Sequence, residues 1–179
     1  RLDDLAQAGV IHPALASIAP HPTLRLTSTR RSEPFRKDAL LVSAGTGSGK
    51  TEAFLYPIID HCLKARDAGE PEGLTAILVY PMNALAIDQL ERLRRLLAGT
   101  GVSFGLYFGG TPSDNAKLGG HKRLQQGQGR REYLQEIRST PPEQDLVVHP
   151  WEERVTEAEM RERPPRILLT NVHQLEVLM

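Results

Sequence analysis

A short apolar segment that runs directly into a glycine-rich loop and then an amphipathic helix limits most strongly how this chain can fold. The apolar run Ala39–Ser43 suits a strand buried on both faces of a parallel sheet. After the loop, from Gly49 onward, apolar residues recur at spacing four, which predicts a helix with a wide buried face. Pro57 should kink this helix without ending it. A strand, a loop and a helix in this order predict an α/β protein.

The glycine-rich loop places several backbone N–H groups around one point, at the positive end of the following helix. Its glycines remove side chains where the backbone must touch a ligand, and this geometry captures phosphate. Lys50 adds a positive charge for the β and γ phosphates, and the Thr51 hydroxyl is suited to ligate Mg²⁺. The loop residues are Ala44, Gly45, Thr46, Gly47, Ser48, Gly49, Lys50 and Thr51.

Strands and helices alternate along the rest of the chain. The predicted elements are a strand over Thr75–Tyr80, a helix from Pro81 that Gly99 or Gly101 ends, a strand over Val102–Phe108, a strand over Arg166–Thr170 and a helix over Val172–Met179. The segment 112–165 is too long for an ordinary connection of about two to six residues, so we interpret it as an insertion. Within it, Thr156 and Glu159 have capping-box spacing, which predicts a short helix.

These elements predict a P-loop fold, in which helices flank a parallel β-sheet. We expect an N-terminal extension over 1–23, with one short helix and then a stretch broken by proline and histidine. A partial nucleotide-binding lobe over 24–179 follows it. The chain opens on Arg1 and stops at Met179 inside a predicted helix, so we expect a piece of a longer protein.

Charge and cysteine content exclude several classes of protein. Lys plus Arg and Asp plus Glu both number 22, so no global positive field marks a nucleic-acid partner and any such contact must be local. The single cysteine, Cys62, excludes an internal disulfide and a multi-cysteine zinc cluster. No apolar run is long enough to span a membrane and no signal peptide is present, so we expect a cytoplasmic protein without a membrane partner.

Four segments together resemble the superfamily 2 helicases in their order and spacing. They are Ala44–Glu52, Tyr80–Gln89, Gly109–Thr111 and Pro164–Asn171. Ala44 stands where most phosphate loops have glycine, which is similar to motif I of this superfamily. The second and fourth segments look like the branch of DEAD/DEAH-like helicases that includes the mitomycin-repair helicases and the DISARM anti-phage helicase.

The resemblance implies a RecA-like lobe of an ATP-dependent helicase that uses ATP and Mg²⁺. Lys50 and Thr51 would be the catalytic residues, Thr51 the Mg²⁺ ligand, and Glu52 would join the loop in binding the nucleotide. The implied partners are single-stranded nucleic acid, with DNA expected, a second RecA-like lobe and further domains of the same parent chain, and proteins of a DNA-repair or anti-phage defence complex. The residues that would line the strand are Pro81, Asn83, Gln89, Gly109, Gly110, Thr170 and Asn171.

Two features depart from the helicase pattern. The glutamine that reads adenine should precede the loop by roughly twenty residues, yet Thr27–Arg36 contains no glutamine. The acidic DExH-type motif II is absent from these 179 residues. Since its carboxylates supply a second Mg²⁺ anchor and activate water, we expect this segment alone to be inactive.

Other interpretations use the same residues. The loop could belong to another P-loop ATPase or a kinase, or to a non-catalytic nucleotide-binding interaction module. Asn83 could cap its helix, and Thr170 the last helix. Gly109 and Gly110 could form a simple turn, and Gln89 could be a solvated helix position.

Overall fold

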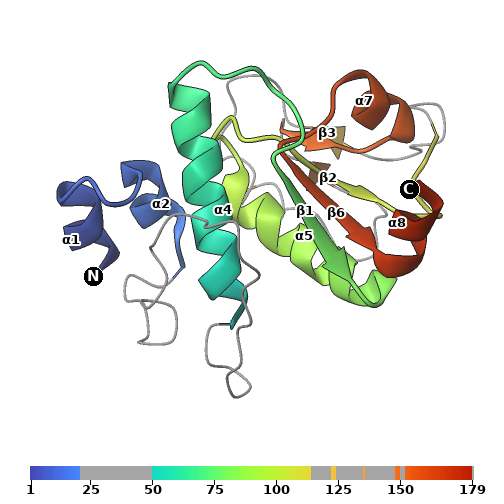
Figure 1. Ribbon diagram of the computed structural model, residues 1–179, viewed down its shortest axis with the longest axis horizontal. Coiled ribbons are helices and arrows are strands. Elements are labelled where there is room, and N and C mark those ends of the chain that lie inside the picture. The colour runs from blue at the N-terminus through green and yellow to red at the C-terminus, as the bar shows by residue number, and fades with distance from the viewer. Residues whose placement is uncertain (21–49, 114–121, 124–134, 136–147, 150–151, 179) are drawn as a thin grey trace. The chain divides into compact units, whose positions relative to one another are not determined.

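The computed structural model describes residues 1–20, 50–113, 122–123, 135, 148–149 and 152–178, which form two compact units, Arg1–Gly69 and Glu70–Met179 (Figure 1). The predicted strand Ala39–Ser43 and the loop residues 44–49 lie outside the described residues, as does most of the predicted insertion. The predicted division at residue 23 stays a prediction.

The first unit holds helices α1 (Leu2–Gln7), α2 (Pro13–Ile18) and α4 (Lys50–Asp67). The sequence predicts only one helix before residue 20, followed by a stretch broken by proline and histidine. Within that stretch, His12 caps α2 and Pro13 is its first residue. Proline suits the first position of a helix, and His12 Nδ1 accepts a hydrogen bond from the Ala14 N–H at 3.0 Å.

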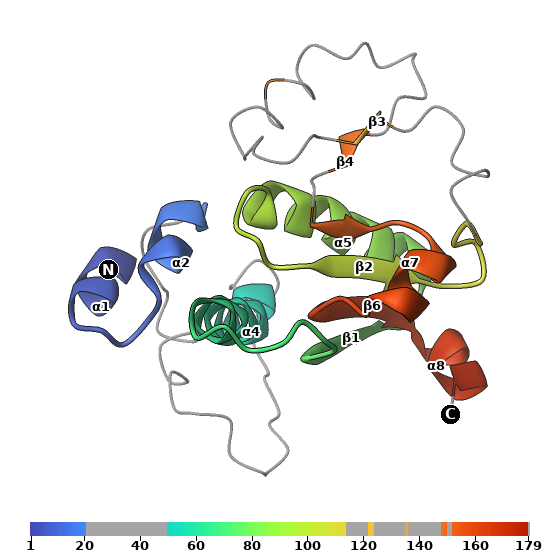
Figure 2. The ribbon, with the colours of Figure 1, turned by 90° about the horizontal axis from the view of Figure 1, so that it is seen from above.

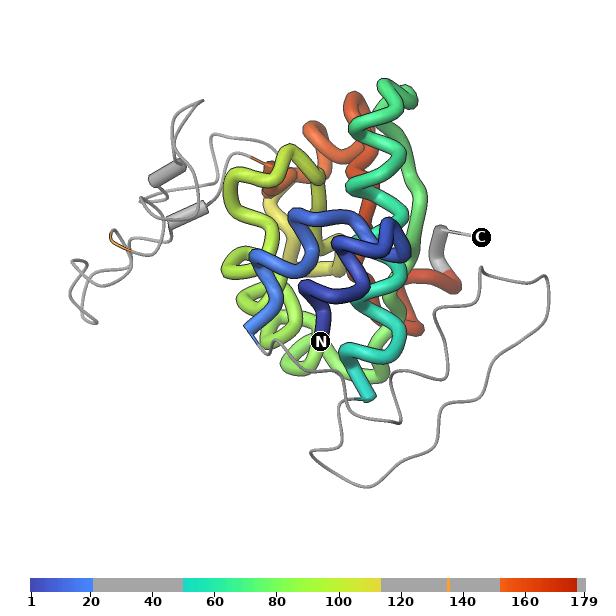
Figure 3. The backbone as a smooth tube through the Cα atoms, turned by 90° about the vertical axis from the view of Figure 1, so that its left-hand side faces the viewer, coloured from blue at the N-terminus to red at the C-terminus, as the bar shows by residue number. Residues whose placement is uncertain are grey.

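Helix α4 continues through Pro57, as predicted, and lies beside α2 (Figure 3). The His12 N–H donates to Asp60 Oδ1 at 2.5 Å, and Lys64 Nζ donates to the Val10 carbonyl at 3.1 Å. His12 Nε2 lies 2.5 Å from Asp67 Oδ2, and hydrogen bonds from His12 and Arg66 lower the pKa of Asp67. The N-terminal segment is therefore fixed to the helix that follows the phosphate loop.

The second unit is built on a parallel sheet in the order β1–β6–β2–β5. These strands are β1 (Ala76–Tyr80), β6 (Ile167–Asn171), β2 (Phe104–Tyr107) and β5 (Glu153–Arg154). Strand β6 pairs with β1 from Ala76↔Ile167 to Tyr80↔Asn171, and with β2 from Phe104↔Ile167 to Tyr107↔Thr170. Two short strands, β3 (Lys122–Arg123) and β4 (Val148–His149), form a separate parallel pair. The predicted parallel α/β architecture is confirmed.

The second unit also contains three helices: α5 (Asn83–Leu97), α7 (Glu157–Glu162) and α8 (Val172–Leu178). Helix α5 lies along one face of the sheet (Figure 2). Apolar residues recur at helical spacing along α5, and four of them are buried: Ala86, Leu90, Leu93 and Leu97. The helix begins at Asn83 rather than Pro81, and it ends before Gly99, whose φ of 75° stops it as predicted.

Strand β1 is only partly buried, although its sequence is a continuous apolar run. Ile77 and Val79 are 44% and 41% exposed, and only Leu78 on this strand is buried. Strand β1 is the outermost of the described strands at its end of the sheet, whereas Ile167 and Leu169 on β6 are fully buried. A continuous apolar run therefore marked the strand correctly but not its position in the sheet.

The end of the predicted insertion belongs to the sheet. Helix α7 confirms the capping box, because the Glu159 N–H donates to Thr156 Oγ1 at 3.2 Å. Strand β5 was not predicted, because its two residues are charged and give no apolar signal. Two buried side chains hold it: Glu153 accepts hydrogen bonds from Arg94 Nε and Nη2, both at 2.8 Å. Arg94 also pairs with Glu91.

Removing one partner of this buried ion pair should destabilise the second unit. Arg94→Met leaves the Glu153 carboxylate buried without its guanidinium, which should cost roughly 3–5 kcal/mol of unfolding free energy. Arg94→Met with Glu153→Leu should cost clearly less, because neither charge then remains buried alone. Urea unfolding of the wild type, Arg94→Met and the double variant measures these losses of unfolding free energy. A loss below about 1 kcal/mol for Arg94→Met would contradict the pairing.

Glu152 should make stability depend on pH. Burial raises its pKa, although its Oε1 accepts a hydrogen bond from the Gly101 N–H at 2.9 Å. The folded state therefore binds the proton more tightly than the unfolded state, so stability is lost as pH rises from the ordinary glutamate range to the raised pKa. Glu152→Gln should remove this loss, and the exposed Glu162→Gln should not. Urea titrations across this pH window measure it, and parallel curves for wild type and Glu152→Gln would contradict it.

Candidate functional site

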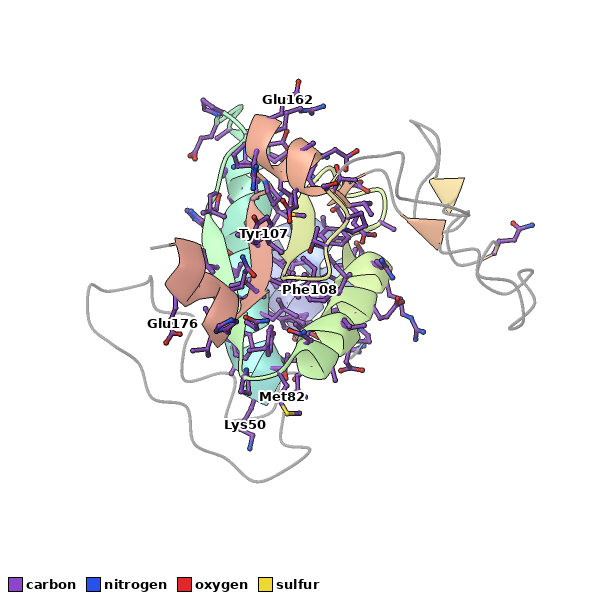
Figure 4. All side chains as sticks on the ribbon, turned by 90° about the vertical axis from the view of Figure 1, so that its right-hand side faces the viewer. Lys50, Met82, Tyr107, Phe108, Glu162 and Glu176 are labelled. Atoms are coloured by element: carbon purple, nitrogen blue, oxygen red, sulfur yellow. The ribbon has the colours of Figure 1, made fainter. Side chains whose placement is uncertain are left out.

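The described part of the predicted phosphate loop lies at the start of α4. Lys50 and Thr51 are the first two residues of the helix, and Glu52 follows in the first turn. Lys50 is exposed and projects outward (Figure 4), whereas Thr51 and Glu52 are half-buried. Ala44, Gly45, Thr46, Gly47, Ser48 and Gly49 lie outside the described residues, so their roles stay predictions. A cationic and a hydroxyl side chain in a first helical turn fit a nucleotide phosphate and its Mg²⁺.

The residues predicted to line a nucleic-acid strand gather at one edge of the sheet. Pro81 and Asn83 follow β1, Gly109 and Gly110 follow β2, and Thr170 and Asn171 end β6. Since β1, β6 and β2 are adjacent and parallel, their carboxyl ends lie on the same side (Figure 1). Open parallel sheets bind ligands at this edge.

Gln89 differs from the other predicted strand contacts because it lies within α5. Its side chain is half-buried, its Nε2 donates to Asp88 Oδ2 at 3.0 Å, and its Oε1 is buried without a hydrogen-bond partner among the described residues. The Gln89 side chain is therefore less exposed to solvent than the alternative of a solvated helix position implies.

Asn83 and Asn171 meet across the ends of β1 and β6. Asn171 Nδ2 donates to Asn83 Oδ1 at 2.5 Å, and Asn171 Oδ1 accepts a hydrogen bond from the Gln174 N–H at 2.5 Å. Asn171 therefore caps α8, which begins at Val172. Met82, not Asn83, occupies the N-cap position of α5, so the helix-cap alternative for Asn83 is wrong.

Thr170 has a structural role that the sequence did not indicate. It is fully buried, and its hydroxyl donates to the Tyr107 carbonyl on β2 at 2.8 Å. The alternative that Thr170 caps the last helix is wrong, because Asn171 does so. Its predicted contact with nucleic acid stays a prediction.

The double glycine after β2 forms a tight turn that Thr111 closes. The Thr111 N–H donates to the Phe108 carbonyl at 2.9 Å, while Thr111 Oγ1 accepts from the Phe108 N–H and donates to the Leu106 carbonyl, both at 3.0 Å. Gly109 and Gly110 are exposed, so their backbone is open at the strand edge. Thr111 is not among the predicted strand contacts, and in the structure it holds the turn through backbone groups.

The two glycines should respond differently to alanine. A Cβ on Gly110 would lie 2.6 Å from Phe108 Cε2, whereas a Cβ on Gly109 meets nothing within 4 Å. Gly110→Ala should cost about 1 kcal/mol because the Phe108 ring must move off its rotamer, and Gly109→Ala should stay within about 0.5 kcal/mol of wild type. Thermal unfolding measures both. Equal effects would show that the ring does not restrict residue 110.

Neither a metal cluster nor a membrane span is found in the part of the chain that the structure describes. Its residues contain no group of three or more His, Cys, Asp or Glu side chains placed to hold a metal ion. Within the same residues, no helix is both long and apolar enough to cross a membrane.

A parallel α/β sheet with polar strand ends is a fold common among nucleotide-binding proteins. The DEAD/DEAH box helicase family model matches residues 30–141, which is more than half of the chain. The chain belongs to the DEAD/DEAH box helicase family, and the predicted resemblance is confirmed. The parallel sheet flanked by helices is consistent with a RecA-like helicase domain. Family membership leaves no support for the kinase alternative.

Three curated relatives illustrate the similarity. Druantia protein DruE from Escherichia coli is 44% identical over 90 residues, which cover 41% of this chain and 5% of that protein. ATP-dependent RNA helicase rok1 from Aspergillus oryzae is 32% identical over 109 residues, covering 58% and 15%. DEAD-box ATP-dependent RNA helicase 41 from Oryza sativa is 41% identical over 76 residues, covering 41% and 14%. The chain therefore spans only a small part of these relatives. No solved structure matches it.

Proposed function

We propose that this chain is the ATP-binding portion of an ATP-dependent nucleic-acid helicase or translocase. The observation that carries the proposal is the alignment of three predicted strand-contact segments at the carboxyl edge of β1, β6 and β2 in a chain of the DEAD/DEAH family. Another P-loop enzyme has no need for ordered polar groups at three neighbouring strand ends. A helicase needs them to hold a polymer.

ATP would be held by Ala44 to Glu52, with Lys50 at the β and γ phosphates. The Thr51 hydroxyl would ligate Mg²⁺, which neutralises charge on the phosphates during hydrolysis. The exposure of Lys50 at the helix start supports this role, because a lysine packed inside the fold could not reach a bound nucleotide. The rest of the catalytic machinery would come from the parent chain, including a second RecA-like lobe.

A single strand of nucleic acid would lie along the edge formed by Pro81, Asn83, Gly109, Gly110 and Asn171. Exposed amide and backbone N–H groups donate to phosphate oxygens without reading base sequence, so the grip would be similar for all sequences. Two of the relatives above are named RNA helicases. We expected DNA, so binding tests should use both polymers. A role in DNA repair or anti-phage defence, with its protein partners, belongs to the same proposal.

Lys50→Ala in the full-length protein should reduce strand-stimulated ATP hydrolysis by at least about a hundredfold, because a charge-assisted phosphate contact is lost. Strand binding without nucleotide should persist. Lys64→Ala is the matched control: the same charge is removed from α4, but Lys64 pairs with Asp60 at 2.8 Å. Phosphate release and strand-binding titrations at fixed salt measure both. Hydrolysis that survives Lys50→Ala would overturn the assignment of the loop.

A further inference from the structure

The hydrogen bonds around Asn171 form a chain with a fixed direction. It starts at the Gln174 N–H, passes through the Asn171 side chain and ends on Asn83 Oδ1, with both links at 2.5 Å. The register Tyr80↔Asn171 places Asn171 beside the end of β1, so these side chains belong to neighbouring strand ends.

The direction follows from the first donor. A backbone N–H can only donate, so the Asn171 amide must turn its oxygen toward Gln174 and its NH₂ group toward Asn83. Asn83 must then meet that NH₂ group with its own oxygen. Reversing either amide would place two donors or two acceptors face to face.

The same hydrogen bonds determine which group of the Asn83 amide faces outward. With Oδ1 turned to Asn171, Nδ2 faces the other way, and the structure records no acceptor for it among the described residues. Asn83 is exposed at the first position of α5. Its outward group is therefore a hydrogen-bond donor, which suits a phosphate oxygen and would be mismatched if the amide were reversed.

We infer that Asn171 is a positioning residue that orients the Asn83 amide as a donor to the sugar-phosphate backbone. It acts through Asn83, because its own amide groups are both occupied and its side chain is half-buried. The inference rests on the proposed function, and it changes the role of Asn171 from a direct strand contact to a residue that prepares one.

Asn171→Ser in the full-length protein tests the inference. Serine keeps a good N-cap for α8 but is too short to reach Asn83. Asn83→Ala should weaken binding of a single-stranded oligonucleotide roughly tenfold, as expected for one hydrogen bond to a charged group. Asn171→Ser should weaken it by roughly three- to tenfold when Asn83 is present, and by less than about twofold when residue 83 is alanine. Oligo-dT and oligo-rU at the same salt are the probes.

Two further variants separate positioning from capping. Gln174→Ala leaves the backbone N–H in place, so it should bind the strand like wild type. Asn171→Asp caps a helix as well as asparagine but cannot donate to Asn83, so it should lose affinity at least as strongly as Asn171→Ser. The new carboxylate also repels phosphate, so only the part of this loss that disappears in the Asn83→Ala background reports positioning. A capping role alone predicts the same loss in both backgrounds. ATP affinity, measured in parallel, should stay unchanged in all variants.

The outcomes are distinct. Loss on Asn171→Ser that disappears in the Asn83→Ala background supports the inference. Equal loss in both backgrounds overturns it, because Asn171 would then act independently of Asn83. Strand binding by the wild type that Asn83→Ala does not reduce also overturns it, but leaves the proposed function standing. Wild-type protein that binds neither oligonucleotide, with or without ATP, overturns the proposed function and this inference together.

Discussion

The pairing of β6 with both β1 and β2 is the constraint on which the second unit depends. Ile167 and Leu169 of β6 are fully buried, as expected for a strand inside a parallel sheet, and Thr170 adds a side-chain bond to the Tyr107 carbonyl. Successive residues of a strand point to opposite faces, so a shift of one residue would exchange the surroundings of Thr170 and Asn171. The register of β6 thus buries Thr170 and places Asn171 beside the end of β1.

The other end of the sheet is held by side-chain charges rather than by a long ladder. Strand β5 has only two residues, yet Glu153 is buried against Arg94, and Arg154 Nη2 donates to Glu72 Oε1 at 2.8 Å. A buried charge that loses its partner is costly, so these pairs penalise any other placement of this segment. The same packing buries Glu152, whose Oε2 has no partner among the described residues.

The residues at the candidate strand site divide into those that present groups and those that hold others in place. Thr111 closes the glycine turn, and Thr170 bonds to the neighbouring strand. Asn171 caps α8 and fixes the Asn83 amide. Asn83 and the backbone of Gly109 and Gly110 remain exposed. Some residues of these segments therefore hold the strand ends in place, while others are exposed and can contact a ligand.

The sequence by itself determined the order of the longer strands and the helices in the second unit, the buried face of α5, the capping box of Thr156 with Glu159, and the helicase family. Each depends on residues close together in the chain, whose periodicity and spacing can be read directly. Tertiary structure decided that the charged residues Glu153 and Arg154 form a strand, that Ile77 stays exposed, and that the Asn171 amide bonds to Asn83. Those facts depend on partners far away in sequence: Arg94 and Glu153 are 59 residues apart, and Asn83 and Asn171 are 88 apart. No local sequence pattern predicts these contacts, because only the packing of the sheet brings the partners together.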